Sequence, residues 1–129
     1  MIKPYQNILL IDDDEDDREI FVSAVRGISN DVSFTGMSDA ASALRKLENR
    51  DLVPEVIFLD INMPIMNGSQ FLKEVKKNEA LKNIPVIIFS TSSDASTIQK
   101  MKELGADIFI TKPGKYKDLV DLLKPLISI

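Results

Sequence analysis

The most constraining feature of this sequence is a fivefold alternation of short apolar runs with longer amphipathic stretches. Runs of about four residues rich in β-branched side chains favour strands, and runs that are apolar throughout are typical of strands buried on both faces of a parallel sheet. The expected strands span residues 8–11, 32–35, 56–59, 86–89 and 107–110. Because the run at 32–35 is mixed in polarity, we expect it at an edge of the sheet.

The stretches between these runs carry helical periodicity and residues that begin or end helices. Apolar residues at Ile20, Phe21, Ala24 and Val25 fit one face of a helix that ends near Gly27. The other helices are expected to start at Ser38-Asp39, Asn67-Gly68, Ser93-Asp94 and Tyr116, with Gly105 closing the fourth of the five. These β–α units predict a single α/β domain over residues 1–129, with a doubly wound, five-stranded parallel sheet and helices on both faces.

Two missing residue types narrow the chemistry. The chain has no Cys and no His, which excludes disulfides, thiolate and imidazole metal ligands, and catalysis by a Ser-His pair. Any reaction must use carboxylates, hydroxyls, lysine and an oxygen-preferring metal such as Mg²⁺. No apolar run is long enough to cross a membrane and no signal peptide is recognised, so we expect a cytoplasmic protein.

Polar side chains follow the expected strands at the points where those strands end. Asp12 and Asp13 follow the first strand, Asp60 the third, Ser90 the fourth and Lys112 the fifth. Sheets of this class bind ligands at the carboxyl ends of their strands, so we expect these side chains to form one site. Carboxylates gathered there would repel one another unless a cation such as Mg²⁺ joined them. A hydroxyl and a lysine suit an oxyanion, which predicts a phosphoryl site where a carboxylate could itself be phosphorylated.

An unbroken acidic run at residues 12–17 accounts for the whole net charge of −4, because the rest of the chain has 14 acids and 16 bases. Asp12 and Asp13 lie next to a buried strand and are expected to face the site. Asp14 to Asp17 are expected to begin a helix, where carboxylates are favoured by the helix dipole. We therefore expect these last four acids to add negative potential rather than ligands.

Four segments resemble the receiver domains of two-component response regulators: ILLIDDDED, VIFLDINMPIMNG, PVIIFSTSS and GADIFITKP. The resemblance covers the whole chain and implies a flavodoxin-like (βα)5 fold with strand order 2-1-3-4-5. It also implies that Asp60 is the phosphoacceptor. The implied ligands of Mg²⁺ are Asp12, Asp13, Asp60 and the backbone carbonyl of Asn62. Ser90 and Lys112 would each contact an oxygen of the phosphoryl group.

The same resemblance implies a conformational switch. Phosphorylation would draw the Ser90 hydroxyl inward and leave room for the ring of Phe109, so that the surface around the fourth helix and fifth strand changes shape. Pro64 and Gly68 would shape the loop after the third strand. The peptide bond before Pro113 would be cis, an isomer that only X-Pro bonds adopt at low cost.

The function implied by the resemblance is that of a stand-alone response regulator. It would receive a phosphoryl group from a sensor histidine kinase or a histidine phosphotransfer protein, and signal through phosphorylation-dependent contact with a downstream protein target. It would not be an enzyme, although it could catalyse its own phosphorylation and dephosphorylation. The chain ends after the fifth helix without a basic arm, so we expect no nucleic acid or membrane partner, and a monomer or weak homodimer. KKNEALKNIPVIIFSTSS and KPGKYKDL resemble stand-alone receivers paired with phytochrome-type kinases.

Two other functions remain open from the residues alone. An aspartyl-nucleophile phosphohydrolase of the haloacid dehalogenase type would use the pattern Asp12-x-Asp14, but the chain has little room for a cap and Asp60 would have no role. A pseudo-receiver that only binds partners would not need the full set of acids, hydroxyl and lysine. Labelling separates the first alternative, because a phosphohydrolase is phosphorylated on Asp12 and a receiver on Asp60.

Overall fold

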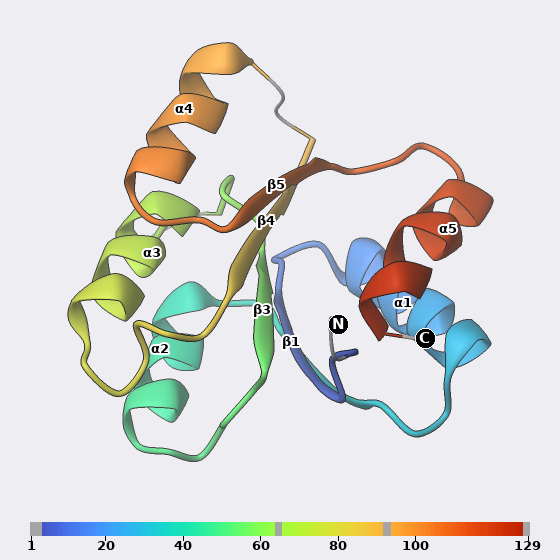
Figure 1. Cartoon of the computed structure of the whole chain (residues 1–129), viewed down its shortest axis with the longest axis horizontal. Helices are drawn as coiled ribbons and strands as arrows, with labels where there is room; N and C mark the ends of the chain where they lie inside the picture. The colour runs from blue at the N-terminus through green and yellow to red at the C-terminus, as the bar shows by residue number, and fades with distance from the viewer. Residues whose placement is uncertain (1–3, 64–65, 92–93, 128–129) are drawn as a thin grey trace.

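The computed structural model describes residues 4–63, 66–91 and 94–127, and five parallel strands form its central sheet (Figure 1). The strands are β1 (Asn7–Ile11), β2 (Ser33–Met37), β3 (Val56–Leu59), β4 (Val86–Ser90) and β5 (Ile108–Thr111). They lie in the order β2-β1-β3-β4-β5. The helices are α1 (Glu15–Ile28), α2 (Ala40–Glu48), α3 (Gly68–Lys77), α4 (Ala95–Glu103) and α5 (Tyr116–Ile127). The fold class and strand order expected from the sequence are therefore confirmed.

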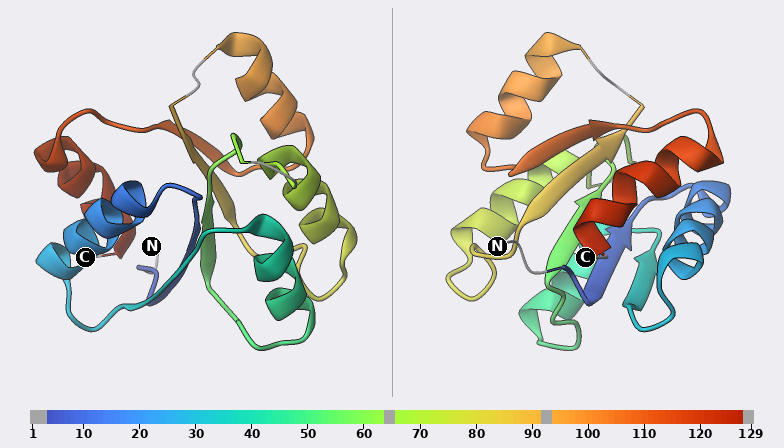
Figure 2. Two further views of the ribbon diagram at one scale, coloured as in Figure 1. Left: turned by 180° about the vertical axis from the view of Figure 1, so that it is seen from behind. Right: turned by 45° about the vertical axis from the view of Figure 1, so that its right-hand side comes forward.

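The helices cover the two faces of the sheet unequally. Figures 1 and 2 show α1 and α5 side by side on one face and α2, α3 and α4 on the other. The three central strands β1, β3 and β4 are almost wholly buried, as their apolar runs predict. β2 and β5 are the edges and remain partly exposed. The edge position expected for the mixed run is thus confirmed, and the edge position of β5 follows from the expected strand order.

Polar side chains cap the helices where the sequence predicts their starts. The Asp39 and Asp94 carboxylates accept hydrogen bonds from the backbone N–H of Ala41 and Thr97 at the starts of α2 and α4. At α3, Asn67 and Gln70 form a reciprocal capping box. Such caps satisfy backbone donors that have no partner within the helix. Ser93, the other residue of the predicted fourth start, lies outside the described residues.

Two glycines at helix ends behave differently from each other. Gly105 follows α4 with a φ of +106°, a left-handed conformation that closes a helix and favours glycine. Gly27, in contrast, lies inside α1, which ends at Ile28. Helix α1 stops one residue later than expected because Ser29 becomes extended while its N–H still donates to the Val25 carbonyl.

The loop after β3 returns closely onto the start of α3. A Cβ on Gly68 would lie 2.5 Å from Cα of Ile61, so only glycine allows this approach. Pro64, the other residue expected to shape this loop, lies outside the described residues. The bond before Pro113 is trans, so the cis expectation is wrong here, and trans is the isomer that X-Pro bonds intrinsically prefer. None of the helices in the described ranges combines the length and apolarity that a transmembrane span requires.

Candidate functional site

The carboxyl ends of the strands bring together side chains that are far apart in sequence. Asp12 directly follows β1 and Asp60 directly follows β3, and these two strands are neighbours with Ile11 opposite Leu59. The Asp12 N–H donates to the Met37 carbonyl at 2.9 Å and the Asp60 N–H to the Ile11 carbonyl at 3.0 Å. Because the sheet hydrogen bonding continues through both aspartates, their backbones are fixed where their side chains leave the sheet.

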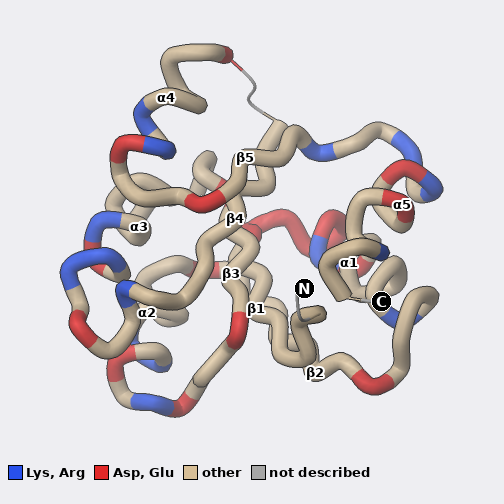
Figure 3. Tube along the Cα trace, viewed as in Figure 1, with Lys and Arg blue, Asp and Glu red and all other residues tan. Residues whose placement is uncertain are grey.

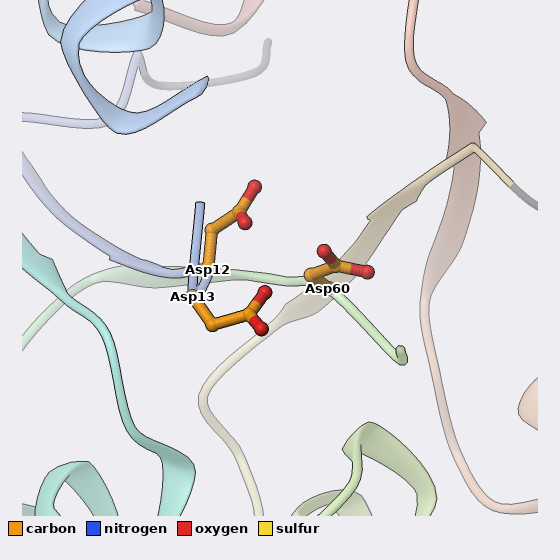
Figure 4. A group of neighbouring side chains, drawn as sticks. All are labelled: Asp12, Asp13 and Asp60. Carbon is orange, nitrogen blue, oxygen red and sulfur yellow. The ribbon is translucent and has the colours of Figure 1, made fainter. Parts of the chain in front are cut away.

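Three of the predicted site residues form an acidic cluster. Carboxylate oxygens of Asp12, Asp13 and Asp60 all lie within 4.8 Å of one another. Figure 4 shows the two consecutive aspartates on one segment and Asp60 beside them on another. Asp12 and Asp60 are buried, whereas Asp13 is exposed. Since Mg²⁺ and similar cations prefer carboxylate oxygens and retain several waters, a buried pair with one exposed acid suits such an ion.

Local hydrogen bonds orient the buried carboxylates. Asp12 Oδ1 accepts from the Asp14 backbone N–H at 3.0 Å, and Asp60 Oδ1 accepts from the Asn62 backbone N–H at 3.1 Å. Arg18 Nη1 donates to the Asp12 backbone carbonyl at 2.7 Å and so ties the first turn of α1 to the end of β1. Burial raises the pKa of Asp12, and the nearby Asp60 charge adds to this, although hydrogen bonding to Lys112 opposes it. A cation at the cluster would therefore stabilise the charged form of Asp12.

Lys112, which follows β5, lies at the centre of the site and has three carboxylate partners. Its Nζ lies 2.8 Å from Asp12 Oδ2, 2.8 Å from Asp17 Oδ2 and 3.3 Å from Asp60 Oδ2. Burial disfavours the charged ammonium, but the hydrogen bonds to Asp12 and Asp17 outweigh it, so the pKa of Lys112 is raised. The same Nζ lies 5.8 Å from the centroid of the Phe89 ring. Lys112 is thus a fixed positive charge beside Asp60.

Ser90 and Asn62 complete the polar surroundings. Ser90 is the last residue of β4 and is fully buried. The Asn62 side-chain amide donates to its hydroxyl at 3.4 Å, which connects the loop after β3 to the end of β4. This arrangement places a hydroxyl on a neighbouring strand end, next to the residue whose backbone carbonyl is the expected fourth metal ligand.

Asp17 makes a contact that the sequence did not predict. It was expected only to add negative potential, yet its carboxylate bonds directly to the Lys112 ammonium. Asp14 instead caps α1, and Glu15 and Asp16 are exposed. A signal was present, because Asp17 precedes the buried Phe21 by four residues and so lies on the inward side of α1. Figure 3 shows this acidic segment running from the end of β1 into α1.

Phe109, the expected switch aromatic, lies in the edge strand β5. It is half-buried in β5, opposite Ile88 of β4, and packs against the core under α2, α3 and α4. Its neighbour Ile110 packs against the opposite core, under α1 and α5. Phe109 is therefore placed to connect the sheet with the α4 side of the molecule.

Known proteins resemble this chain along nearly its whole length. The sequence model described as "Response regulator receiver domain" matches residues 8–124. "Response regulator Rcp1" from Synechocystis sp. (strain ATCC 27184 / PCC 6803 / Kazusa) is 28% identical over 97% of this chain and 88% of that protein. The Mn²⁺-bound structure of Rcp1 has a TM-score of 0.83 at 27% identity, covering 93% of this chain and 90% of its own. The phosphorylated cyanobacterial phytochrome response regulator RcpA has a TM-score of 0.84 at 27% identity, covering 94% and 90%.

Proposed function

This chain belongs to the response regulator receiver domain family, and we propose that it forms one receiver domain whose Asp60 accepts a phosphoryl group from a histidine of a partner protein. The observation that carries the proposal is the Lys112 ammonium held between Asp12 and Asp60, beside a cluster suited to a divalent cation. The donor would be a sensor histidine kinase or a histidine phosphotransfer protein. These 129 residues contain no histidine, so the donor histidine lies outside them. A phytochrome-type kinase is the first donor to test, given the likeness to RcpA.

In the proposed reaction, a carboxylate oxygen of Asp60 attacks the phosphorus of the donor phosphohistidine. The new P–O bond forms as the P–N bond breaks, and the donor imidazole leaves and takes up a proton from water. Lys112 pairs with one oxygen of the transferred group and the Ser90 hydroxyl donates to another. Asp12, Asp13, Asp60 and the backbone carbonyl of Asn62 would hold the cation. When bound, Mg²⁺ supplies positive charge to the phosphoryl oxygens.

The proposed output is a change in the surface around α4 and β5 that a downstream protein target recognises. Ser90 moves toward the phosphoryl group, and Phe109 takes the room that its hydroxyl leaves. Weak anchoring of α4 supports this, because Met101 is its one buried side chain among the described residues. The protein would act in the cytoplasm as a monomer or weak homodimer, without nucleic acid or membrane partners, and as a switch rather than a classical enzyme.

The decisive experiment incubates the protein with acetyl phosphate and Mg²⁺, and compares wild type with Asp60→Asn and with Asp51→Asn, an exposed acid outside the site. Wild type and Asp51→Asn should acquire one base-labile phosphoryl group, whereas Asp60→Asn should acquire none because the attacking oxygen is altered. Undiminished labelling of Asp60→Asn would overturn the acceptor assignment. Labelling on Asp12 would favour a phosphohydrolase, and no labelling of wild type a pseudo-receiver.

A second experiment separates acceptance of phosphate from the response to it. Lys112→Ala should bind Mg²⁺ nearly as wild type does, because the three acids of the cluster remain. The phosphorylated variant should not show the backbone NMR shifts in α4 and β5 that wild type shows, since no cation then links β5 to the phosphoryl group. Normal shifts in phosphorylated Lys112→Ala would refute this role of the lysine.

A further inference from the structure

One of the three carboxylates that bond to Lys112 stands apart from the acidic cluster. Asp12 and Asp60 contact the lysine and also belong to the group that can hold a metal ion. Asp17 contacts the lysine at the same 2.8 Å as Asp12 but is not a member of that group. The Asp17 carboxylate therefore remains available to Lys112 when Asp12 and Asp60 bind a cation.

The first turn of α1 holds Asp17 in position. Its backbone N–H donates to Asp14 Oδ1 at 3.1 Å, which fixes the third residue of the helix. The adjacent Arg18 donates from Nη1 to the Asp12 backbone carbonyl at 2.7 Å, which also ties this turn to the end of β1. The Asp17 side chain is 37% exposed and the Lys112 side chain 11%, so this ion pair lies at the rim of the site, between water and the buried acids.

A divalent cation among Asp12, Asp13 and Asp60 would change the balance of forces on Lys112. The cation would bind the carboxylates of Asp12 and Asp60, which are two of the three partners of Lys112. It would also repel the nearby Lys112 ammonium. Asp17 would still offer its full charge. Without Asp17, repulsion by the cation would favour movement of the Lys112 ammonium away from the cluster.

The surroundings of Lys112 leave space for its side chain to move. A pocket of about 170 Å³ adjoins it among α1, the loop after β5 and the start of α5, and both Asp17 and Lys112 line it. Gly114 contributes to the same pocket, and a Cβ at that position would meet nothing within 4 Å. Packing alone therefore does not keep the ammonium beside Asp60.

From this geometry we propose that Asp17 is a positioning residue, which keeps the Lys112 ammonium beside Asp60 while a divalent cation occupies the acidic cluster. The inference rests on the proposed function and deepens it. It assigns to the start of α1 a part in phosphoryl transfer, exerted through the lysine rather than on the phosphoryl group. Asp17 itself touches neither the cation nor the reacting atoms.

The first test follows the lysine directly by NMR of its side-chain ammonium, assigned with Lys112→Ala. Ammonium protons are observed when hydrogen bonds slow their exchange with water. In wild type with saturating Mg²⁺, the Lys112 signal should persist, and it should be lost in Asp17→Asn. The matched control is Asp16→Asn, which removes the same charge from the same turn at an exposed position. Loss of the signal in Mg²⁺-loaded wild type, or its persistence in Asp17→Asn, would overturn the proposal.

The second test measures phosphorylation by acetyl phosphate at saturating Mg²⁺. Asp17→Asn should lower the maximal rate about fivefold, while Asp16→Asn stays close to wild type and Asp17→Glu recovers most of the loss. In a Lys112→Ala background, Asp17→Asn should have no further effect, because Asp17 acts only through the lysine. An equal loss in that background would refute the proposal. If wild type is not phosphorylated at Asp60, the proposed function fails, and the NMR test still decides the role of Asp17.

Discussion

The two faces of the sheet are built from different side chains. On the α1 and α5 face, four aromatic rings form a connected cluster, with centroids 5.0–6.4 Å apart: Phe21, Phe34, Phe58 and Phe89. The face under α2, α3 and α4 is mainly aliphatic. On that face α4 contributes a single buried side chain, Met101, among the described residues. One sheet thus separates a face joined by an aromatic cluster from an aliphatic face on which α4 is weakly anchored.

Successive side chains of the central strands point to opposite faces of the sheet, and this alternation produces the difference. Phe58 of β3 faces the aromatic side, and its neighbours Ile57 and Leu59 face the aliphatic side. The site borders the aromatic side, because Lys112 lies near the Phe89 ring. The expected switch residue Phe109 packs on the aliphatic side. The proposed chemistry therefore borders the aromatic face, and the proposed movement involves the aliphatic face.

The largest effect is expected from truncating matched phenylalanines on the two faces. Phe21 of α1 and Phe71 of α3 are both fully buried, and Phe→Ala at such sites costs about 3–5 kcal/mol of unfolding free energy. Phe21 has three aromatic neighbours, so Phe21→Ala should cost about 1 kcal/mol more than Phe71→Ala. Urea denaturation measures both variants. Equal losses would show that the aromatic cluster adds nothing beyond buried area.

A smaller effect is expected at the weakly anchored helix. Met101→Ala should cost about 2 kcal/mol, near the low end for a buried methionine, because little else of α4 is packed. Hydrogen exchange should accelerate in α4 and leave α1 and α5 unchanged. The exposed Lys100 of the same helix offers the control Lys100→Ala. Acceleration spread evenly over both faces would mean that α4 is no more independent than α1.

The smallest effect is expected at the start of α3. Asn67→Ala removes a capping box and should cost about 1 kcal/mol. Asn67→Asp keeps an acceptor for the Gln70 N–H and should recover most of that loss. Thermal unfolding of the two variants tests whether the aliphatic face depends on helix caps as well as on packing. No loss in Asn67→Ala would indicate that packing of α3 alone suffices.

Much of this architecture is readable from local pattern. Apolar runs locate the strands, and Asp39, Asn67 and Asp94 cap the helices that the sequence predicts. The convergence of Asp12, Asp60 and Lys112 follows from their positions after parallel strands. The contact of Asp17 with Lys112 was not predicted, because an acid in the first turn of a helix already has an ordinary explanation in the helix dipole.

The sequence by itself determined which segments become strands and which polar side chains stand at their ends, because period and residue type act over a few neighbouring positions. Only the tertiary structure decided that Asp17 bonds to Lys112, 95 residues away. It also decided that the Ser90 hydroxyl lies beside the Asn62 side-chain amide, 28 residues away. Both outcomes depend on which distant groups come within contact distance. Packing of the whole chain sets those distances, and no local pattern encodes them.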